Sequence, residues 1–104
     1  MFESIKSFFG LKQPNYAQLI ENGAIILDVR SNSEFASGHI DGSINIPVNK
    51  LADNLRKLKD KSKPIITCCA SGMRSATAKG LLEARGYANV INGGAWHRLN
   101  QKIA

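Results

Sequence analysis

Two short apolar runs, AIILDV at 24–29 and IITCC at 65–69, constrain the fold more than any other feature of the sequence. Neither run alternates apolar with polar residues, so a strand formed by either would be covered on both faces. Strands of this kind occur in parallel sheets with helices on both sides. Two further strands are expected over 43–48 and 89–91, and Pro47 marks the end of the first of these.

Helical patterns separate the expected strands. Leu51, Leu55 and Leu58 recur at helical spacing, and charged residues occupy the opposite face. The other expected helices span 16–22, a single turn at 33–37, 75–85, and the chain from residue 95 onward, with Gly93-Gly94 turning into the last one. This alternation predicts an α/β fold with a mostly parallel central sheet flanked by helices on both faces.

The chain of 104 residues is expected to form one domain over 14–104, preceded by an amphipathic segment over 1–13. The apolar residues of that segment share one face at helical spacing: Phe2, Ile5, Phe8 and Phe9. We expect a short helix docked on the domain, with contact to a membrane surface or a partner as the alternative. No run approaches the roughly 20 apolar residues that span a bilayer, so no membrane span is expected.

Charge and cysteine content exclude several classes of function. The net charge of +6 favours anions, but no nucleic acid is expected, because aromatic residues do not alternate with basic ones and no nucleic-acid motif is present. Cys68 and Cys69 are the only cysteines, and neither His39 nor His97 stands at a ligand spacing from them. We therefore expect no metal, no cofactor and no disulfide framework, and a reducing compartment, the cytoplasm.

The stretch CASGMRS, residues 69–75, lies where the strand at 65–69 leads into a helix. Sites in open α/β sheets form just beyond the carboxyl ends of strands. The small residues 70–72 allow a tight curl, and Gly72 can adopt a positive φ. The N–H groups of this loop and of the first helical turn can then converge on the Cys69 sulfur and stabilise its thiolate without a histidine base. Cys68 should point to the other face of the strand as a small core residue, with a resolving thiol as the alternative.

The sequence resembles the single-domain rhodanese-like sulfurtransferases over residues 14–101. The matching pieces, in the order of that family, are LDVR (27–30), EF and GHI (34–35 and 38–40), GSINIP (42–47), CASGMRS (69–75) and GGAW (93–96). CASGMRS is the piece that bears on activity. Cys68 is a departure, because strands of this family more often carry an aromatic or aliphatic residue there, and it leaves a thiol–disulfide side function open.

The resemblance implies a thiosulfate sulfurtransferase. Cys69 would take the outer sulfur of a small anionic donor such as thiosulfate as a persulfide, and pass it to cyanide, a thiol or a protein acceptor. Arg74 would stabilise the loop or the donor and is the second expected catalytic residue. The expected substrate-binding residues form the rest of the loop: Ala70, Ser71, Gly72, Met73 and Ser75.

The remaining matched residues are interpreted as scaffold. Asp28, Arg30 and Glu34 are expected to form a pair or network that braces the loops, with donor contact by Arg30 as the alternative. His39 is expected to be a hydrogen-bonded turn residue, and Trp96 a core residue rather than a substrate platform.

Two other functions remain open from the sequence. A phosphatase or arsenate reductase would also place a cysteine and an arginine around an oxyanion, but only four residues separate Cys69 from Arg74, whereas cysteine phosphatases characteristically have five. A non-enzymatic module that binds partners or carries a persulfide would use the same surface. Inactive members of the family usually lack the cysteine that this chain retains.

Overall fold

The computed structural model describes residues 14–104, and the expected amphipathic segment at 1–13 lies outside them. Its centre is a sheet of four parallel strands in the order β2-β1-β3-β4. The strands are β1 (Ile25–Asp28), β2 (Ile44–Asn45), β3 (Ile65–Cys69) and β4 (Val90–Ala95). Because the strands are parallel, their carboxyl ends meet at one edge of the sheet. The predicted parallel α/β sheet is confirmed.

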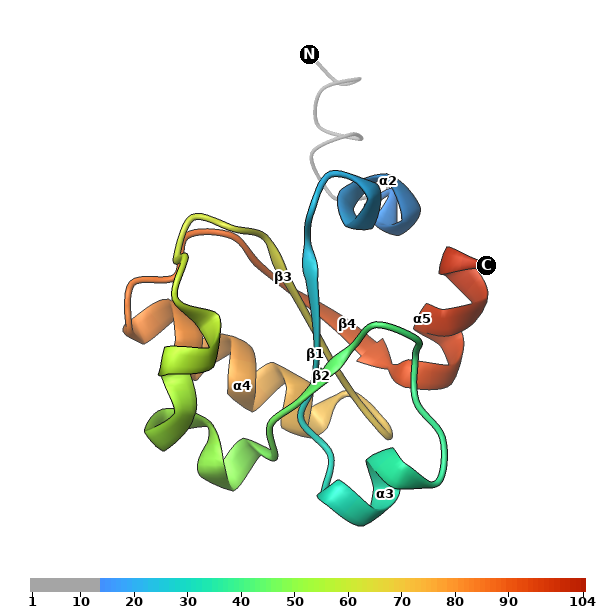
Figure 1. Ribbon diagram of the computed structural model, residues 1–104, viewed down its shortest axis with the longest axis horizontal. Coiled ribbons are helices and arrows are strands. Elements are labelled where there is room, and N and C mark those ends of the chain that lie inside the picture. Colours follow the sequence, from blue (N-terminus) through green and yellow to red (C-terminus); the bar gives the residue numbers. More distant parts are fainter. Residues whose placement is uncertain (1–13) are drawn as a thin grey trace, which may run out of the picture.

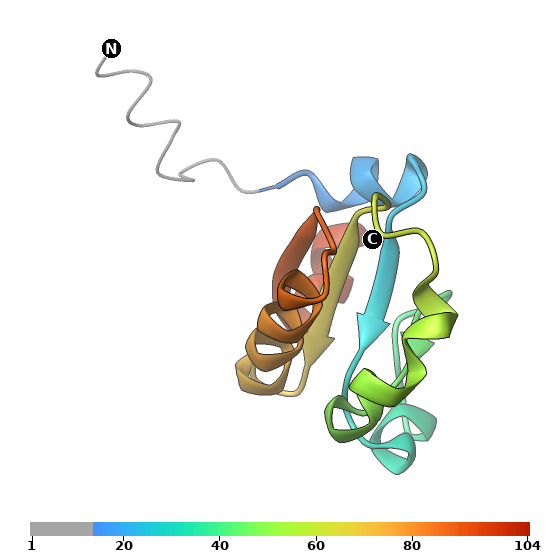
Figure 2. The same cartoon turned by 90° about the vertical axis from the view of Figure 1, so that its left-hand side faces the viewer.

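Helices cover both faces of the sheet (Figure 1). The helices of the domain are α2 (Tyr16–Glu21), α3 (Asn32–Ala36), the 3₁₀ helix η2 (Val48–Leu58), α4 (Met73–Ala84) and α5 (Trp96–Ile103). In Figure 1, η2 and α4 lie on one side of the strands and α2 and α5 on the other. Figure 2 views the sheet from the side of α4 and η2, with β1 and β3 running in the same direction behind them.

Each face of the sheet has its own core, because strand side chains alternate between the faces. On one face, Leu51 and Leu58 of η2 and Leu82 of α4 pack over Ile65 and Cys69. On the other face, Tyr16 of α2 and Leu99 of α5 pack over Ile66 and Cys68. All five residues of β3 are buried, as the continuous apolar run predicted. The two cysteines therefore lie in different cores.

Several element boundaries differ from the sequence prediction. The strand predicted over 43–48 is reduced to β2, and the helix at 48–58 is a 3₁₀ helix with a kink at Asn54 (φ −128°, ψ 26°). Helix α4 begins at Met73, two residues before the predicted start, directly after Gly72. Strand β4 continues to Ala95, through the glycine pair that was predicted to turn the chain.

The glycine pair stays in β4 because the strand bulges there. Thr67 pairs with Asn92 and Cys69 pairs with Ala95, so β4 has one more residue than β3 over this stretch. A Cβ atom on Gly93 would lie 2.8 Å from both the carbonyl oxygen of Thr67 and a methyl group of Ile66. Only glycine lets β4 approach β3 this closely.

We expect Gly93→Ala to destabilise the domain, because the added methyl group meets the backbone of β3, which cannot move aside. Overpacking of this kind costs about 1–3 kcal/mol. Thermal unfolding followed by circular dichroism measures the loss. Gly80→Ala is the matched control, since nothing lies within 4 Å of its Cβ position on α4 and alanine favours the helix. A Gly93→Ala protein as stable as the parent would contradict the close approach.

None of the helices formed by residues 14–104 has both the length and the apolar character needed to cross a membrane.

Candidate active site

The Cys69 sulfur lies at the carboxyl end of β3, beneath the loop that leads into α4. The N–H group of Gly72 donates to Sγ at 2.9 Å and that of Ser75 at 3.4 Å. The thiol of Cys69 lies 3.5 Å from the Ser75 hydroxyl, to which it donates. Gly72 adopts a φ of 108°, the positive value expected for it, and this turn aims the N–H groups inward. The predicted convergence of backbone donors on this sulfur is confirmed.

These donors stabilise the anionic form of Cys69. Burial of the side chain, which is fully excluded from solvent, opposes ionisation. The Ser75 hydroxyl and the N–H groups of Ser75, Gly72 and Ser71 outweigh the burial, so the pKa of Cys69 lies below its ordinary value. No histidine contributes to this shift. Hydrogen bonds alone therefore favour the thiolate form of Cys69 at this site.

Cys68 has the opposite character, although it is adjacent in the chain. Its side chain is fully buried in the core on the α2 and α5 face. Burial, and then the negative charge of Asp28, raise its pKa to about 12. The prediction of a small core residue is confirmed, and the sulfurs of Cys68 and Cys69 belong to opposite faces of β3.

Arg74 forms a bidentate ion pair with Glu34 of α3. Nη1 donates to Oε1 at 2.7 Å and Nη2 donates to Oε2 at 3.0 Å. Hydrogen bonds from Arg74 and from Ser31 lower the pKa of Glu34 to about 2, so the pair stays ionised at neutral pH. Figure 1 shows α3 beside the loop that precedes α4. This geometry favours the loop-bracing role of Arg74 over direct binding of a donor.

Arg30 belongs to a separate buried network below the loops. Its guanidinium binds the Asp28 carboxylate, with Nη2 at 2.8 Å from Oδ2, and donates to the carbonyl groups of Glu34 and Gly38. It also lies 4.6 Å from the centre of the Trp96 ring. The predicted bracing network exists, but the carboxylate of Glu34 is directed to Arg74 instead of Arg30.

The predicted hydrogen bond of His39 is confirmed, whereas Trp96 is half-buried, so its interpretation as a core residue instead of a substrate platform stays a prediction. Nδ1 of His39 lies 2.7 Å from the Phe35 carbonyl oxygen, and its ring stacks on that of Phe35. Trp96 packs against the core on the α2 and α5 face.

The predicted substrate-binding residues divide into two groups. Gly72 and Ser75 face the sulfur, as described above. Ala70, Ser71 and Met73 are exposed at the rim, and Met73 is 78% exposed, an unusual value for a large apolar side chain. Their roles in binding stay predictions.

Sequence reasoning missed Asn92 of β4, whose Oδ1 accepts a hydrogen bond from the Ser75 hydroxyl. The only signal for it in the sequence was a polar residue just before a glycine pair at the end of a strand.

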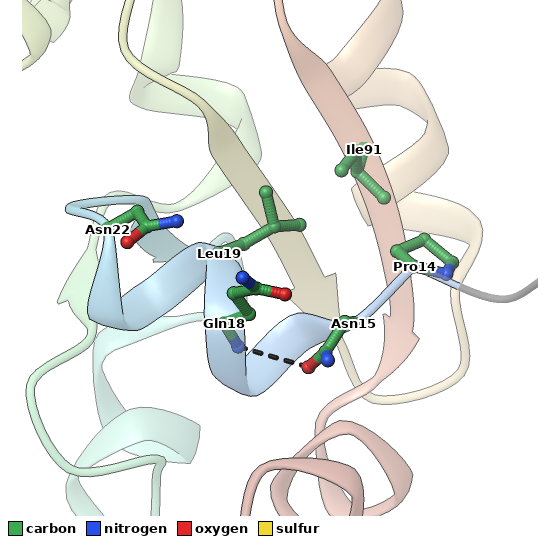
Figure 3. Close-up of a pocket in the computed structure, with 6 residues that line it drawn as sticks. All are labelled: Pro14, Asn15, Gln18, Leu19, Asn22 and Ile91. Atoms are coloured by element: carbon green, nitrogen blue, oxygen red, sulfur yellow. Dashed lines mark hydrogen bonds between the residues drawn. The ribbon is translucent and has the colours of Figure 1, made fainter.

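The structure also has a depression at the other end of the sheet (Figure 3). It has a volume of 420 Å³ and lies between α2 and the start of β4. Its lining residues are Pro14, Asn15, Gln18, Leu19, Asn22 and Ile91. None of them is a charged or nucleophilic residue, so this depression lacks the chemistry found around Cys69.

The geometry defines a class: an α/β domain with a buried cysteine at the end of a central strand, held in a cradle of backbone N–H donors. The chain matches the rhodanese-like domain family over residues 13–95, most of its length, and it belongs to that family.

Its relatives include thiosulfate sulfurtransferases. It is 34% identical to thiosulfate sulfurtransferase GlpE of Pseudomonas syringae over 84 residues, covering 78% of each chain. The solved structure of the human single domain sulfurtransferase TSTD1 matches with a TM-score of 0.76 at 29% identity, over 88% of this chain and 95% of that one. The chain is also 30% identical to the tRNA uridine(34) hydroxylase of Buchnera aphidicola, but covers only 31% of that longer protein. The sulfurtransferase names support sulfurtransferase activity in general terms, and the hydroxylase shows that relatives of this chain also have other functions.

Proposed function

We propose that this protein is a thiosulfate sulfurtransferase that works through a persulfide on Cys69. The observation that carries the proposal is the convergence of the Gly72 and Ser75 N–H groups on the buried Cys69 sulfur, which favours its anionic form. The names of the GlpE relatives support thiosulfate as the donor. A reducing compartment such as the cytoplasm would keep the Cys69 thiol available for this reaction.

The reaction has two half-reactions, both of them substitutions at sulfur. The Cys69 thiolate attacks the outer sulfur of thiosulfate, a new S–S bond forms, and sulfite leaves with the electron pair of the broken S–S bond. A nucleophilic acceptor, such as cyanide or a thiolate, then attacks the outer sulfur of the persulfide and restores the Cys69 thiolate. Anionic sulfur is present at every stage, so the same backbone donors can stabilise the site throughout the cycle.

The loop geometry disfavours the phosphatase alternative. A phosphatase would need its arginine to hold the phosphate, whereas the guanidinium of Arg74 is bound by both carboxylate oxygens of Glu34. Gly72 and Ser75 direct their N–H groups at the Cys69 sulfur itself and leave the loop closely folded over it. A loop folded this closely suits the single sulfur atom of a persulfide better than a tetrahedral phosphate group.

Intact-protein mass spectrometry after brief incubation with thiosulfate tests the proposal. We expect a gain of one sulfur atom, located on Cys69 by peptide mapping and lost when cyanide is added. Cys68→Ala should gain the same mass. If no sulfur is gained while the Cys69 thiolate can still be titrated, thiosulfate is not the donor. Protein persulfides would then be tested, as expected for a persulfide-carrier module.

A further inference from the structure

Asn92 links the cradle to β4. It pairs with Thr67 in the sheet, which places its side chain on the same face as Cys69. Its Oδ1 accepts the Ser75 hydroxyl at 2.7 Å and the Gly94 N–H group at 2.9 Å. Its Nδ2 lies 3.4 Å from the carbonyl oxygen of Gly72, to which it donates. Asn92 thus hydrogen-bonds both Gly72 and Ser75, whose N–H groups donate to the Cys69 sulfur.

The Ser75 hydroxyl has one proton and a choice of acceptors. It is fully buried, so water does not supply another partner. Its oxygen lies 2.7 Å from Asn92 Oδ1, 3.0 Å from the Gly72 carbonyl oxygen and 3.5 Å from Cys69 Sγ. While Cys69 is a thiol, its S–H group donates to Ser75 and the Ser75 proton points away from sulfur. A thiolate has no proton to donate and is a strong acceptor.

We propose that the Ser75 hydroxyl turns between Asn92 Oδ1 when Cys69 is a thiol and Cys69 Sγ when it is a thiolate, which makes Asn92 a positioning residue. The S–H proton leaves to solvent on ionisation, whereas the Ser75 proton stays on its own oxygen and only changes partner. Asn92 therefore stabilises the thiol form and opposes ionisation. The proposal goes beyond sulfur transfer, because it depends only on the ionisation of Cys69.

The sign of each substitution follows from this competition. Asn92→Ala removes an acceptor that serves the thiol form, so the thiolate should form at lower pH. Asn92→Asp supplies a stronger acceptor and a negative charge, so the thiolate should form at higher pH. Ser75→Ala removes the donor to the thiolate and should also raise the midpoint of the titration.

Other charged groups around Cys69 do not change in this series. Arg74 on α4 is paired with Glu34, and Asp28 at the end of β1 is paired with Arg30. Strand β4 carries no titratable residue, and Cys68 does not ionise at neutral pH. The charged residues of η2 are exposed: Lys50, Asp53, Arg56 and Lys57. Those near the start of α5, His97 and Arg98, are exposed on a helix that covers the opposite face.

The test is a pH titration of the thiolate absorbance in the ultraviolet, with the Cys69→Ser protein subtracted as the baseline. It needs no sulfur donor, so it succeeds or fails independently of the proposed function. We expect Asn92→Ala to lower the midpoint by about half a pH unit, the size of one neutral hydrogen bond, and Asn92→Asp to raise it. In the Ser75→Ala background, Asn92→Ala should have no effect.

The controls use Asn89, which lies just before β4 begins and donates a hydrogen bond to the Ser62 carbonyl oxygen. Asn89→Ala and Asn89→Asp should leave the midpoint unchanged. If Asn92→Ala does not fold, the same cycle is run with Asn92→Asp, whose rise should be smaller in the Ser75→Ala background. An unchanged or raised midpoint in Asn92→Ala, or an Asn92 effect that survives the loss of the Ser75 hydroxyl, would overturn the proposal.

Discussion

Sulfur transfer from thiosulfate to cyanide is expected to fall by roughly a thousandfold or more in Cys69→Ser, because the nucleophile is lost. The fold should survive, since serine is nearly isosteric and the N–H groups of Gly72 and Ser75 can bind its oxygen instead. Initial rates of thiocyanate formation measure the loss, and a thermal unfolding curve close to that of the parent shows that the protein is folded.

Cys68→Ala is the matched control for this substitution. It removes the neighbouring thiol, which is buried on the other face of β3 and has a pKa of about 12. We expect most of the transfer activity to remain. A loss as large as that of Cys69→Ser would give the adjacent cysteines a joint role in the mechanism, and turnover retained in Cys69→Ser would refute the assignment of the nucleophile.

The second large effect is expected at Arg74. Arg74→Ala removes the brace between α4 and α3, together with a positive charge that interacts with Cys69. We expect transfer to fall roughly tenfold to a hundredfold through misplacement of the loop, and the thiolate to form at higher pH. Steady-state rates and the thiolate titration measure the two effects separately. An unchanged titration would show that the backbone donors alone determine the pKa of Cys69.

Glu34→Gln separates the two roles considered for Arg74. It frees the Arg74 guanidinium, keeps the positive charge of Arg74 and removes the negative charge of Glu34, so the Cys69 thiolate should form more readily. If Arg74 braces the loop, sulfur transfer should nevertheless become slower. Direct binding of the donor by Arg74 predicts equal or faster transfer in this variant. Lys79→Ala is the control, because it breaks the exposed Lys79–Glu83 pair on the same helix, at 4.0 Å, away from the loop. Surface pairs of that kind contribute little.

The parts of the fold that follow from local sequence were predictable. The uniform apolar runs of β1 and β3 identified covered strands, and their alternation with helices identified the parallel sheet. The position of Cys69 at a strand end, followed by small residues and a glycine, was enough to predict the convergence of N–H groups on sulfur. These features depend on a few consecutive residues, so the sequence carries them directly.

What the sequence did not predict depends on contacts between distant segments. Glu34 and Arg74 are 40 residues apart, and the expectation that Glu34 would join Arg30 considered only its near neighbours. The extension of β4 through Gly93 depends on its contact with Thr67 and Ile66, because a glycine pair taken alone indicates a turn. The role of Asn92 follows from that register, so it could not be recognised before the strands were placed.

The complete burial of the Cys69 sulfur has a consequence for chemical selectivity. A persulfide would extend the side chain by one S–S bond of about 2 Å, and the residues that follow Cys69 in the loop, Ala70 and Ser71, are exposed. Its burial shelters the resting cysteine from bulky electrophiles and from over-oxidation, and the proposed persulfide would carry the sulfur to be delivered beyond the buried Sγ. The proposed enzyme would thus protect the Sγ atom of Cys69, which it retains, and expose the outer sulfur of the persulfide, which it transfers.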